Sequence, residues 1–240
     1  MGSDCERGNS ELPTPHPPLA TAVPTVTARS AACPNCGATI EFRWSGAVQT
    51  ICPYCKAVLV RRDLDLEKVG MVSDLPPTAS PIQLGTEGKF EGDAFVVVGR
   101  IVYQYERGGW NEWHLRTMRG GSAWLSDAQG DLAISTPAKD GGALPAADAL
   151  KVGQSYAIDG TRFRVASLTR ARYAGVEGEL PFTTWDRSEA LFADLDSDGS
   201  GDQLRFATID YSDDTPVAYV GTYVELEQLA ARNLRRFEGW

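Results

Sequence analysis

The sequence predicts a mainly β protein: a small cysteine-bearing ribbon, then a duplicated domain of β-hairpins, barrel-like or sandwich-like, with a C-terminal helix. Three observations predict this class. Two Cys-x2-Cys pairs lie close together, short runs of alternating polar and apolar residues follow, and two later segments share one pattern. The length of 240 residues suits one domain of ordinary size, about 100–150 residues, together with a small module.

The cysteines of the two pairs are the strongest signal in the sequence. They follow the spacing Cys-x2-Cys-x15-Cys-x2-Cys, as Cys33, Cys36, Cys52 and Cys55. Four thiolates at this spacing fit a tetrahedral site for one structural zinc ion. Because four protein ligands leave no open position for water, we expect this zinc to stabilise the fold and not to catalyse. A redox-active cysteine pair and bound iron are the alternatives.

Composition predicts three segments in the N-terminal part of the chain: a tail, a zinc ribbon and a linker. Residues 1–31 hold five prolines among Ser, Thr and Ala, which predicts a disordered tail. The zinc ribbon is expected over residues 32–62, with three short strands around and after the cysteine pairs. A linker is predicted over residues 63–81, where three prolines follow a short apolar patch.

The remaining residues, 82–240, are predicted to form the duplicated all-β domain. The repeat halves lie at about 82–136 and 150–210. The segment IQLG at residue 82 aligns with LKVG at residue 150, and Glu91-Gly92 then falls on Asp159-Gly160. An acidic-Gly turn between two alternating runs predicts a β-hairpin in each half. Two copies can pair their edges or stack their sheets, which hides edge strands that one copy would expose.

The last segment of the chain has a different period. Within residues 225–237, apolar residues recur at near-helical spacing, as Leu226, Ala230, Leu234 and Phe237. This period predicts a C-terminal helix whose apolar face docks on the sheet.

Charge and hydropathy narrow the function classes. The formal net charge of -9 disfavours nucleic-acid binding, which needs clustered Lys and Arg. No apolar run approaches the roughly 18–20 residues needed to cross a bilayer, and no signal-peptide pattern precedes the cysteines. Paired cysteines of this kind fit a reducing compartment, so we expect a cytoplasmic protein, with peripheral membrane association left open.

Further motifs accompany the CPNCG and CPYC pairs. They are LGTEGKFEGDAFVVVGRI from residue 84, WNEWHL from residue 110 and EGELP from residue 177. Together these motifs resemble a bacterial family of domains of unknown function, DUF4178, from the first cysteine pair to the end of the chain. The resemblance implies no established activity or catalytic residue. It implies only an accessory role in bacterial membrane-stress or polyamine-related systems.

The segment from Trp110 to Leu115 holds the best candidates for chemistry. In a strand, its alternation places Trp110, Glu112 and His114 on one face. A carboxylate beside an imidazole could act in acid–base catalysis, together with Glu179. A cross-strand polar pair explains the same residues without catalysis, so no enzymatic activity is predicted. We expect a ligand or partner surface formed by Trp110, Glu112, His114, Glu179 and Trp185.

A second metal motif begins at Asp194. Oxygen ligands at Asp194, Asp196 and Asp198, with Gly199 at the sixth position, resemble the start of a calcium loop. Arg205 stands at the twelfth position, where such a loop needs a bidentate Glu, and the flanking residues predict strands. An exposed acidic turn is therefore expected, and a weak calcium site is the alternative.

These features favour a non-enzymatic accessory or adaptor protein that binds a protein partner through the ribbon and the β domain. The alternative is a small-molecule or lipid-headgroup binder that uses the cleft between the two copies. An enzyme that uses Glu112 and His114 is the third hypothesis.

Overall fold

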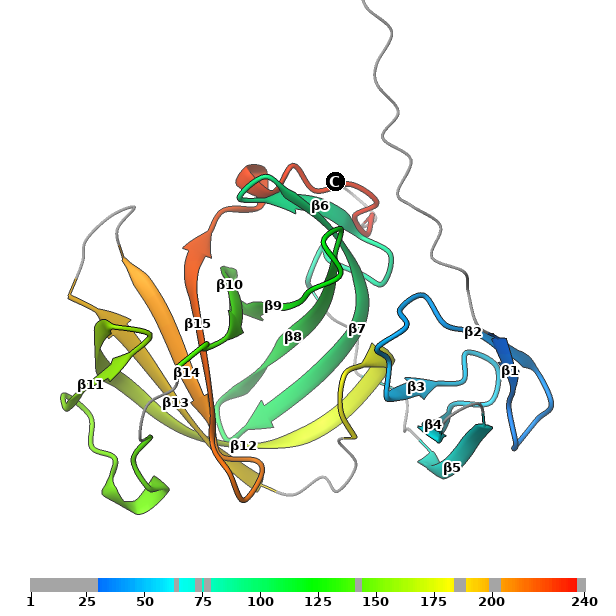
Figure 1. Cartoon of the computed structure of the whole chain (residues 1–240), viewed down its shortest axis with the longest axis horizontal. Coiled ribbons are helices and arrows are strands. Elements are labelled where there is room, and N and C mark those ends of the chain that lie inside the picture. The colour runs from blue at the N-terminus through cyan, green and yellow to red at the C-terminus, as the bar shows by residue number, and fades with distance from the viewer. Residues whose placement is uncertain are drawn as a thin grey trace, which may run out of the picture.

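The structure is a computed structural model that describes residues 30–62, 65–71, 75, 79–140, 144–183, 189–198 and 204–236. Nearly every regular element in these ranges is a β-strand, so the predicted mainly β class is confirmed (Figure 1). A small ribbon, coloured blue and cyan, lies beside a larger β domain (Figure 1). No helix among the described residues has the length and hydrophobicity required to cross a membrane.

The ribbon consists of short antiparallel strands. β1 (Ser30–Ala32) pairs with β2 (Thr39–Glu41), while β3 (Gln49–Ile51), β4 (Ala57–Arg62) and β5 (Asp65–Met71) form a second set. β1 includes residues 30 and 31 of the predicted tail, and β5 occupies residues 65–71 of the predicted linker. Both predictions are corrected there, because these strands pair with backbone groups that would otherwise form open edges. Residues 1–29 of the predicted tail lie outside the described residues.

The large domain contains a closed ring of eight antiparallel strands. In ring order these are β7, β8, β9, β10, β15, β14, β13 and β12, and β12 pairs with β7 to close the ring. This last pairing distinguishes a barrel from a sandwich, which the sequence left open. The strands are β7 (Asp93–Tyr105), β8 (Gly108–Thr117), β9 (Ser122–Ala128), β10 (Asp131–Pro137), β12 (Thr161–Leu180), β13 (Glu189–Ser197), β14 (Arg205–Asp210) and β15 (Val217–Val224).

Glycines allow the ring to close at its two seams. At the β7–β12 seam, a Cβ atom on Gly99 would overlap the carbonyl oxygen of Glu179. At the β10–β15 seam, a Cβ atom on Gly221 would overlap the carbonyl oxygen of Ile134. Only a residue without a side chain permits backbones to approach this closely.

The two segments that the sequence aligns have matching local structure. β6 (Glu87–Phe90) turns into β7 through Glu91-Gly92, and β11 (Ser155–Ile158) turns into β12 through Asp159-Gly160. Glu91 and Asp159 both have φ of 47°, as the first central residue of a type I′ turn requires. Before each hairpin, a glycine N–H donates at 2.8 Å to a valine carbonyl oxygen, from Gly85 to Val97 and from Gly153 to Val165.

Apolar residues of the β domain form three clusters. One cluster buries Trp113 together with Ile82, and a matching cluster in the other half buries Phe163 together with Leu150. Trp113 points away from the ring interior, because its neighbours Trp110 and Glu112 face inward on the same strand. The third cluster contains aromatic residues of the ring interior, with Tyr103 at its centre. Each half of the ring therefore has an apolar core of its own, separate from the interior.

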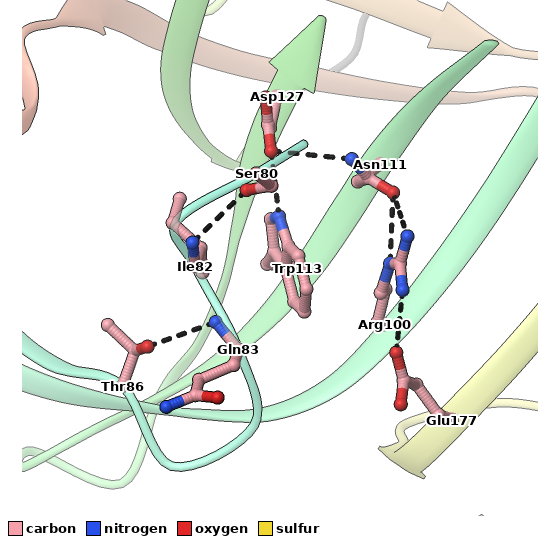
Figure 2. A network of polar contacts seen from close by, with 9 residues as sticks. All are labelled: Ser80, Ile82, Gln83, Thr86, Arg100, Asn111, Trp113, Asp127 and Glu177. Atoms are coloured by element: carbon pink, nitrogen blue, oxygen red, sulfur yellow. Dashed lines mark hydrogen bonds and ion pairs between the residues drawn. The ribbon is translucent and has the colours of Figure 1, made fainter. Parts of the chain in front are cut away.

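A buried arginine joins four strands of the ring (Figure 2). Arg100 Nη1 donates to Glu177 Oε1 at 2.7 Å, while Nε and Nη2 donate to Asn111 Oδ1 at 2.9 and 2.6 Å. Asn111 Nδ2 and Trp113 Nε1 both donate to Asp127 Oδ2 at 3.3 Å. The network connects β7, β8, β9 and β12, and it holds these strands in register.

The prediction of a C-terminal helix over residues 225–237 is wrong. This segment forms a single 3-10 turn, η3 (Leu226–Leu229), like the other short turn, η1 (Ala147–Ala149). Ala230 ends η3 in the left-handed conformation with φ of 45°, and Asn233 has φ of 56°, so the turn does not continue as a helix. Leu229 packs into the same cluster as Trp113, which explains its apolar character without a helix. Residue 237 lies outside the described residues.

Candidate functional site

The four predicted cysteine ligands lie together in the ribbon. Their sulfur atoms all lie within 4.8 Å of one another, with Cys33 Sγ 3.7 Å from Cys55 Sγ and Cys36 Sγ 3.7 Å from Cys52 Sγ. Zinc–sulfur bonds of about 2.3 Å in a tetrahedral site place the sulfur atoms about 3.8 Å apart. The cluster could therefore hold a metal ion, and its geometry is consistent with a CxxC...CxxC zinc-binding motif.

Two matching backbone turns position these cysteines. Gly37 N–H donates to Cys33 O at 2.8 Å, and Lys56 N–H donates to Cys52 O at 3.0 Å. Gly37 and Lys56 have φ of 75° and 60°, so each turn places a left-handed residue directly after its second cysteine. The same local fold thus presents both pairs toward one point.

Glu179 connects the ribbon to the barrel. Its carboxylate accepts the backbone N–H groups of Arg43 at 2.6 Å and Trp44 at 2.8 Å. Beside it, Glu179 and Leu180 of β12 pair with Thr50 and Gln49 of β3. Burial raises the pKa of Glu179, and the two N–H donors act against this rise. The side chain thus holds the ribbon loop against the end of β12.

His114 lies behind the same junction. Its Nδ1 is 2.9 Å from the backbone oxygen of Glu179, and its Nε2 is 2.8 Å from Ser122 Oγ. Because a carbonyl oxygen only accepts, Nδ1 carries the proton and Nε2 accepts from the Ser122 hydroxyl. Burial lowers the pKa of His114 to about 4, so the imidazole is neutral at physiological pH. In the predicted acid–base group, His114 therefore contacts the backbone of Glu179, while the carboxylates of Glu179 and Glu112 bind other partners.

A cavity of about 410 Å³ lies inside the ring, and all eight ring strands contribute to its wall. Aromatic residues dominate one side. The rings of Tyr103 and Trp110 stack with centroids 4.8 Å apart, and Phe192 meets both of them edge-on. Eight-stranded barrels can hold one small ligand, and ligand sites usually measure about 300–1,000 Å³. The cavity has the size and the lining of a small-molecule site.

Glu112 is the titratable group of this wall with the most unusual environment. Its Oε1 accepts from Trp110 Nε1 at 3.0 Å, and Ser126 Oγ donates to Oε2 at 2.8 Å. Burial raises the pKa of Glu112 to about 8, the charges of Asp194 and Asp210 add to the rise, and the two hydrogen bonds oppose it. A carboxyl group that titrates near neutral pH inside a cavity indicates a candidate functional site.

The other predicted site residues are distributed differently. Trp110 lines the cavity with Glu112, whereas Trp185 lies outside the described residues. Asp194 also lines the cavity and accepts from Ser167 Oγ at 2.9 Å.

The expected exposed acidic turn, with a weak calcium loop as its alternative, does not begin at Asp194, because Asp194 and Asp196 belong to strand β13 and Asp194 lines the cavity. Asp196 accepts from the Tyr223 hydroxyl at 3.1 Å, and Asp198 forms an exposed ion pair with Arg164 at 3.5 Å. In the described part of the chain, the cysteines are the only group of three or more such side chains close enough to share a metal ion.

Sequence reasoning missed several residues of the cavity wall, including Tyr103, Asp210 and Tyr219. Alternation within β7, β14 and β15 was an available signal for the face of each residue. It could not show that these three faces enclose the same space, because that depends on how the ring closes.

Residues 83–226 match the family model described as Domain of unknown function (DUF4178). The chain belongs to the DUF4178 family. No curated protein and no solved structure gave a match. In this DUF4178 chain, Gly99 and Arg100 of the motif are structural, since one permits the β7–β12 seam and the other joins Asn111 to Glu177. Trp110 and Glu112 of the WNEWHL motif instead face the cavity.

Proposed function

We propose that this DUF4178 protein binds a small organic molecule inside its barrel. The observation that carries the proposal is the cavity of about 410 Å³, lined by all eight strands of the ring. From the sequence, a small ligand was expected in a cleft between the two copies. In this proposal the ligand lies inside the ring that both halves form. The matching hairpins and seams support the view that the two halves are copies of one unit.

Packing alone does not account for this interior. The two halves have separate apolar clusters outside the ring, which supply the core that a domain of this size needs. The interior instead combines aromatic rings with polar groups such as Ser126, Thr208 and Asp210. A few polar groups in a mostly apolar wall are typical of ligand sites, where they fix the orientation of the ligand.

We assign zinc to the cysteine cluster, with a structural role. Four thiolates complete a tetrahedral shell and leave no position for a substrate. The ribbon contacts the barrel through Glu179 and β3, and none of its described residues lines the cavity. Ile51 of β3 packs against the aromatic cluster of the ring interior from outside the cavity wall. In this proposal the ribbon is a stable attachment to the ligand-binding domain.

Thermal unfolding with a library of small aryl compounds tests the ligand-binding proposal. We expect at least one compound to raise the Tm of the full chain in a saturable way. The Ala128→Trp variant, which fills the cavity wall, should lose this shift, and Val152→Trp, at a position that is 63% exposed, should keep it. The absence of any shift, or a shift that Ala128→Trp retains, would contradict the proposal.

A protein partner of the ribbon is the second candidate function. Tyr54 lies between the cysteines of the second pair and is 72% exposed, which is unusual for a large aromatic side chain. Chemical crosslinking in cells would compare the wild type with Tyr54→Ala at equal zinc content. A partner lost from the variant supports this role, and equal crosslinking contradicts it.

A further inference from the structure

The wall of the cavity carries acidic groups without basic ones. Four carboxylic acids line it, and none of the lining residues that the structure describes is Lys, Arg or His. The acids are Glu112, Asp131, Asp194 and Asp210. Burial raises the pKa of Asp194 and Asp210 as well as that of Glu112. Carboxylates without a cationic partner are unfavourable in a buried space, so this wall is suited to a guest that brings positive charge.

The aromatic side of the wall has the same preference. The stacked rings of Tyr103 and Trp110 adjoin the acids, because the indole N–H of Trp110 donates to Glu112. The faces of such rings attract cations, and aromatic cages are a common way to hold ammonium groups. The acids and the rings therefore favour one class of ligand.

The spacing of the acids argues against a metal ion as that ligand. Among the described residues, only the cysteines bring three or more ligand atoms within 4.8 Å of one another. Hard metal ions bind oxygen ligands at about 2.0–2.6 Å, so ligands of one ion lie close together. Glu112, Asp194 and Asp210 are not grouped closely enough for all three to ligate one ion, whereas a larger cation can contact acids on several strands.

We propose that the cavity binds an organic cation, either a protonated amine or a quaternary ammonium compound. Its charged group lies at Glu112 beside the rings of Trp110 and Tyr103, and its apolar body packs against the remaining aromatic wall, which includes Phe192. This inference rests on the proposed function, because it specifies the ligand class of the same cavity.

Cation binding in this site is coupled to proton release. A bound cation stabilises the carboxylate form, so it lowers the pKa of Glu112 from its value of about 8 in the free protein. Affinity therefore rises with pH up to about 8, by as much as about tenfold per pH unit for one proton released, and then levels off.

The other shifted titratable groups of the wall either add to the rise in cation affinity with pH or stay uncharged. Asp194 on β13 and Asp210 on β14 have raised pKa values, so their ionisation also favours the cation. Tyr103 on β7 and Tyr219 on β15 have pKa values raised by burial and stay protonated below pH 9. Burial also raises the pKa of Tyr223 on β15, which stays protonated in the same range. Tyr105 on β7 and Asp131 on β10 are the remaining titratable residues of the wall, since β12 contributes only Ala166, Ser167 and Thr169.

Two probes of similar shape test the proposal: benzyltrimethylammonium, a permanent cation, and 2,2-dimethyl-3-phenylpropan-1-ol, a neutral alcohol. Each is titrated into the full chain by calorimetry at pH 6, 7, 8 and 9. We expect the cation to bind at least about tenfold more tightly than the alcohol at pH 8, with affinity that rises from pH 6 to pH 8. Alcohol affinity should not change with pH in this way.

Variants distinguish the preference for a cation from ligand binding in the cavity itself. Glu112→Gln should lose most of the preference for the cation and most of its pH dependence while still binding the alcohol. Asp194→Asn should reduce the preference by a smaller factor and provides a second test should Glu112→Gln fold poorly. Glu91→Gln, in the exposed hairpin turn, is the matched control and should behave as the wild type.

Two results would overturn the cation assignment: equal binding of both probes, or a cation preference that Glu112→Gln and Asp194→Asn both retain. If the alcohol still binds and Ala128→Trp abolishes that binding, the cavity remains a ligand site and only the ligand class is wrong. If neither probe binds and no library compound shifts the Tm, the proposed function fails together with this inference.

Discussion

The ribbon brings four cysteine thiols together, and the barrel cavity brings four carboxylic acids together, but the spacing of the groups differs between the two sites. In the ribbon, four thiols lie within 4.8 Å of one another and come from two turns that are close in sequence. In the cavity, carboxyl groups come from β8, β10, β13 and β14, and no three of them approach that closely. The distance between these groups thus distinguishes the cysteine cluster, which could hold one metal ion, from the cavity, for which we propose a larger organic ligand.

Loss of one cysteine ligand should have the largest effect, and it should be confined to the ribbon. Cys33→Ser removes a buried ligand, and structural zinc contributes about 10–16 kcal/mol to the folding of small zinc domains. We expect the ribbon to lose its metal and its structure while the barrel stays folded, because each half of the ring has its own apolar cluster. Zinc analysis and amide NMR spectra would measure both outcomes.

Tyr54→Ser is the matched control for this prediction, since Tyr54 belongs to the same metal turn and is exposed. It should keep one zinc ion per chain. Full zinc content in Cys33→Ser would show that Cys33 is not a metal ligand. Loss of barrel signals together with the metal would show that the barrel does not fold independently of the ribbon.

Removal of the Glu179 carboxylate should weaken the junction between the two parts. Glu179→Ala leaves the N–H groups of Arg43 and Trp44 without their acceptor, which should lower the free energy of unfolding by about 2–4 kcal/mol. Glu179→Gln keeps one acceptor oxygen and should lose about half as much. Urea unfolding and hydrogen exchange at these two amides would measure the effect.

The exposed residue Glu67 provides the control for the junction. It pairs with Arg62 at 3.2 Å on the surface, and Glu67→Ala should change the stability by about 0.5 kcal/mol or less. Unchanged exchange at Arg43 and Trp44 in Glu179→Ala would remove the assigned role of this carboxylate.

Glu112→Gln should have a smaller effect that depends on pH. The pKa of Glu112 is raised from 4.5 to about 8, so the folded state binds a proton more tightly than the unfolded state does. This contribution to stability is present at low pH and is lost as pH rises from about 4.5 through 8. Glu112→Gln should therefore resemble the wild type at pH 5 and be more stable by about 1–3 kcal/mol at pH 9.

Urea unfolding at both pH values measures this difference, with Glu91→Gln as an exposed control that should show no pH-dependent change. An equal stability difference at pH 5 and pH 9 would mean that Glu112 titrates normally. That result would also remove the proton coupling from the cation proposal.

Local features of this protein were predictable from the sequence. The spacing of the cysteines identified the metal cluster, and the acidic-Gly pairs identified both hairpins, because a few adjacent residues determine each feature. Alternation around Trp110 and Glu112 likewise showed which side chains share a face. In each case the contacts that matter are close in sequence.

Features that depend on distant contacts were not predictable. The pairing of β12 with β7 closes the ring and creates the cavity, and no local pattern specifies it. Glu179 was selected as a candidate for chemistry, yet its partners are ribbon amides more than a hundred residues away. The prediction of a C-terminal helix was wrong for a related reason. The buried residue of this segment is Leu229, which contacts the Trp113 cluster and lies outside the predicted apolar face, whereas Ala230 of that face is exposed.

Strand β12 has a consequence for how the molecule moves in solution. It is 20 residues long, its residues Ala166, Ser167 and Thr169 line the cavity, and its last two residues pair with β3 of the ribbon. Main-chain hydrogen bonds therefore run without a break from the ribbon strands into the ring. Strands β3, β4 and β5 of the ribbon therefore continue the sheet of the ring, so we expect their backbone amides and those of the barrel to share a single rotational correlation time.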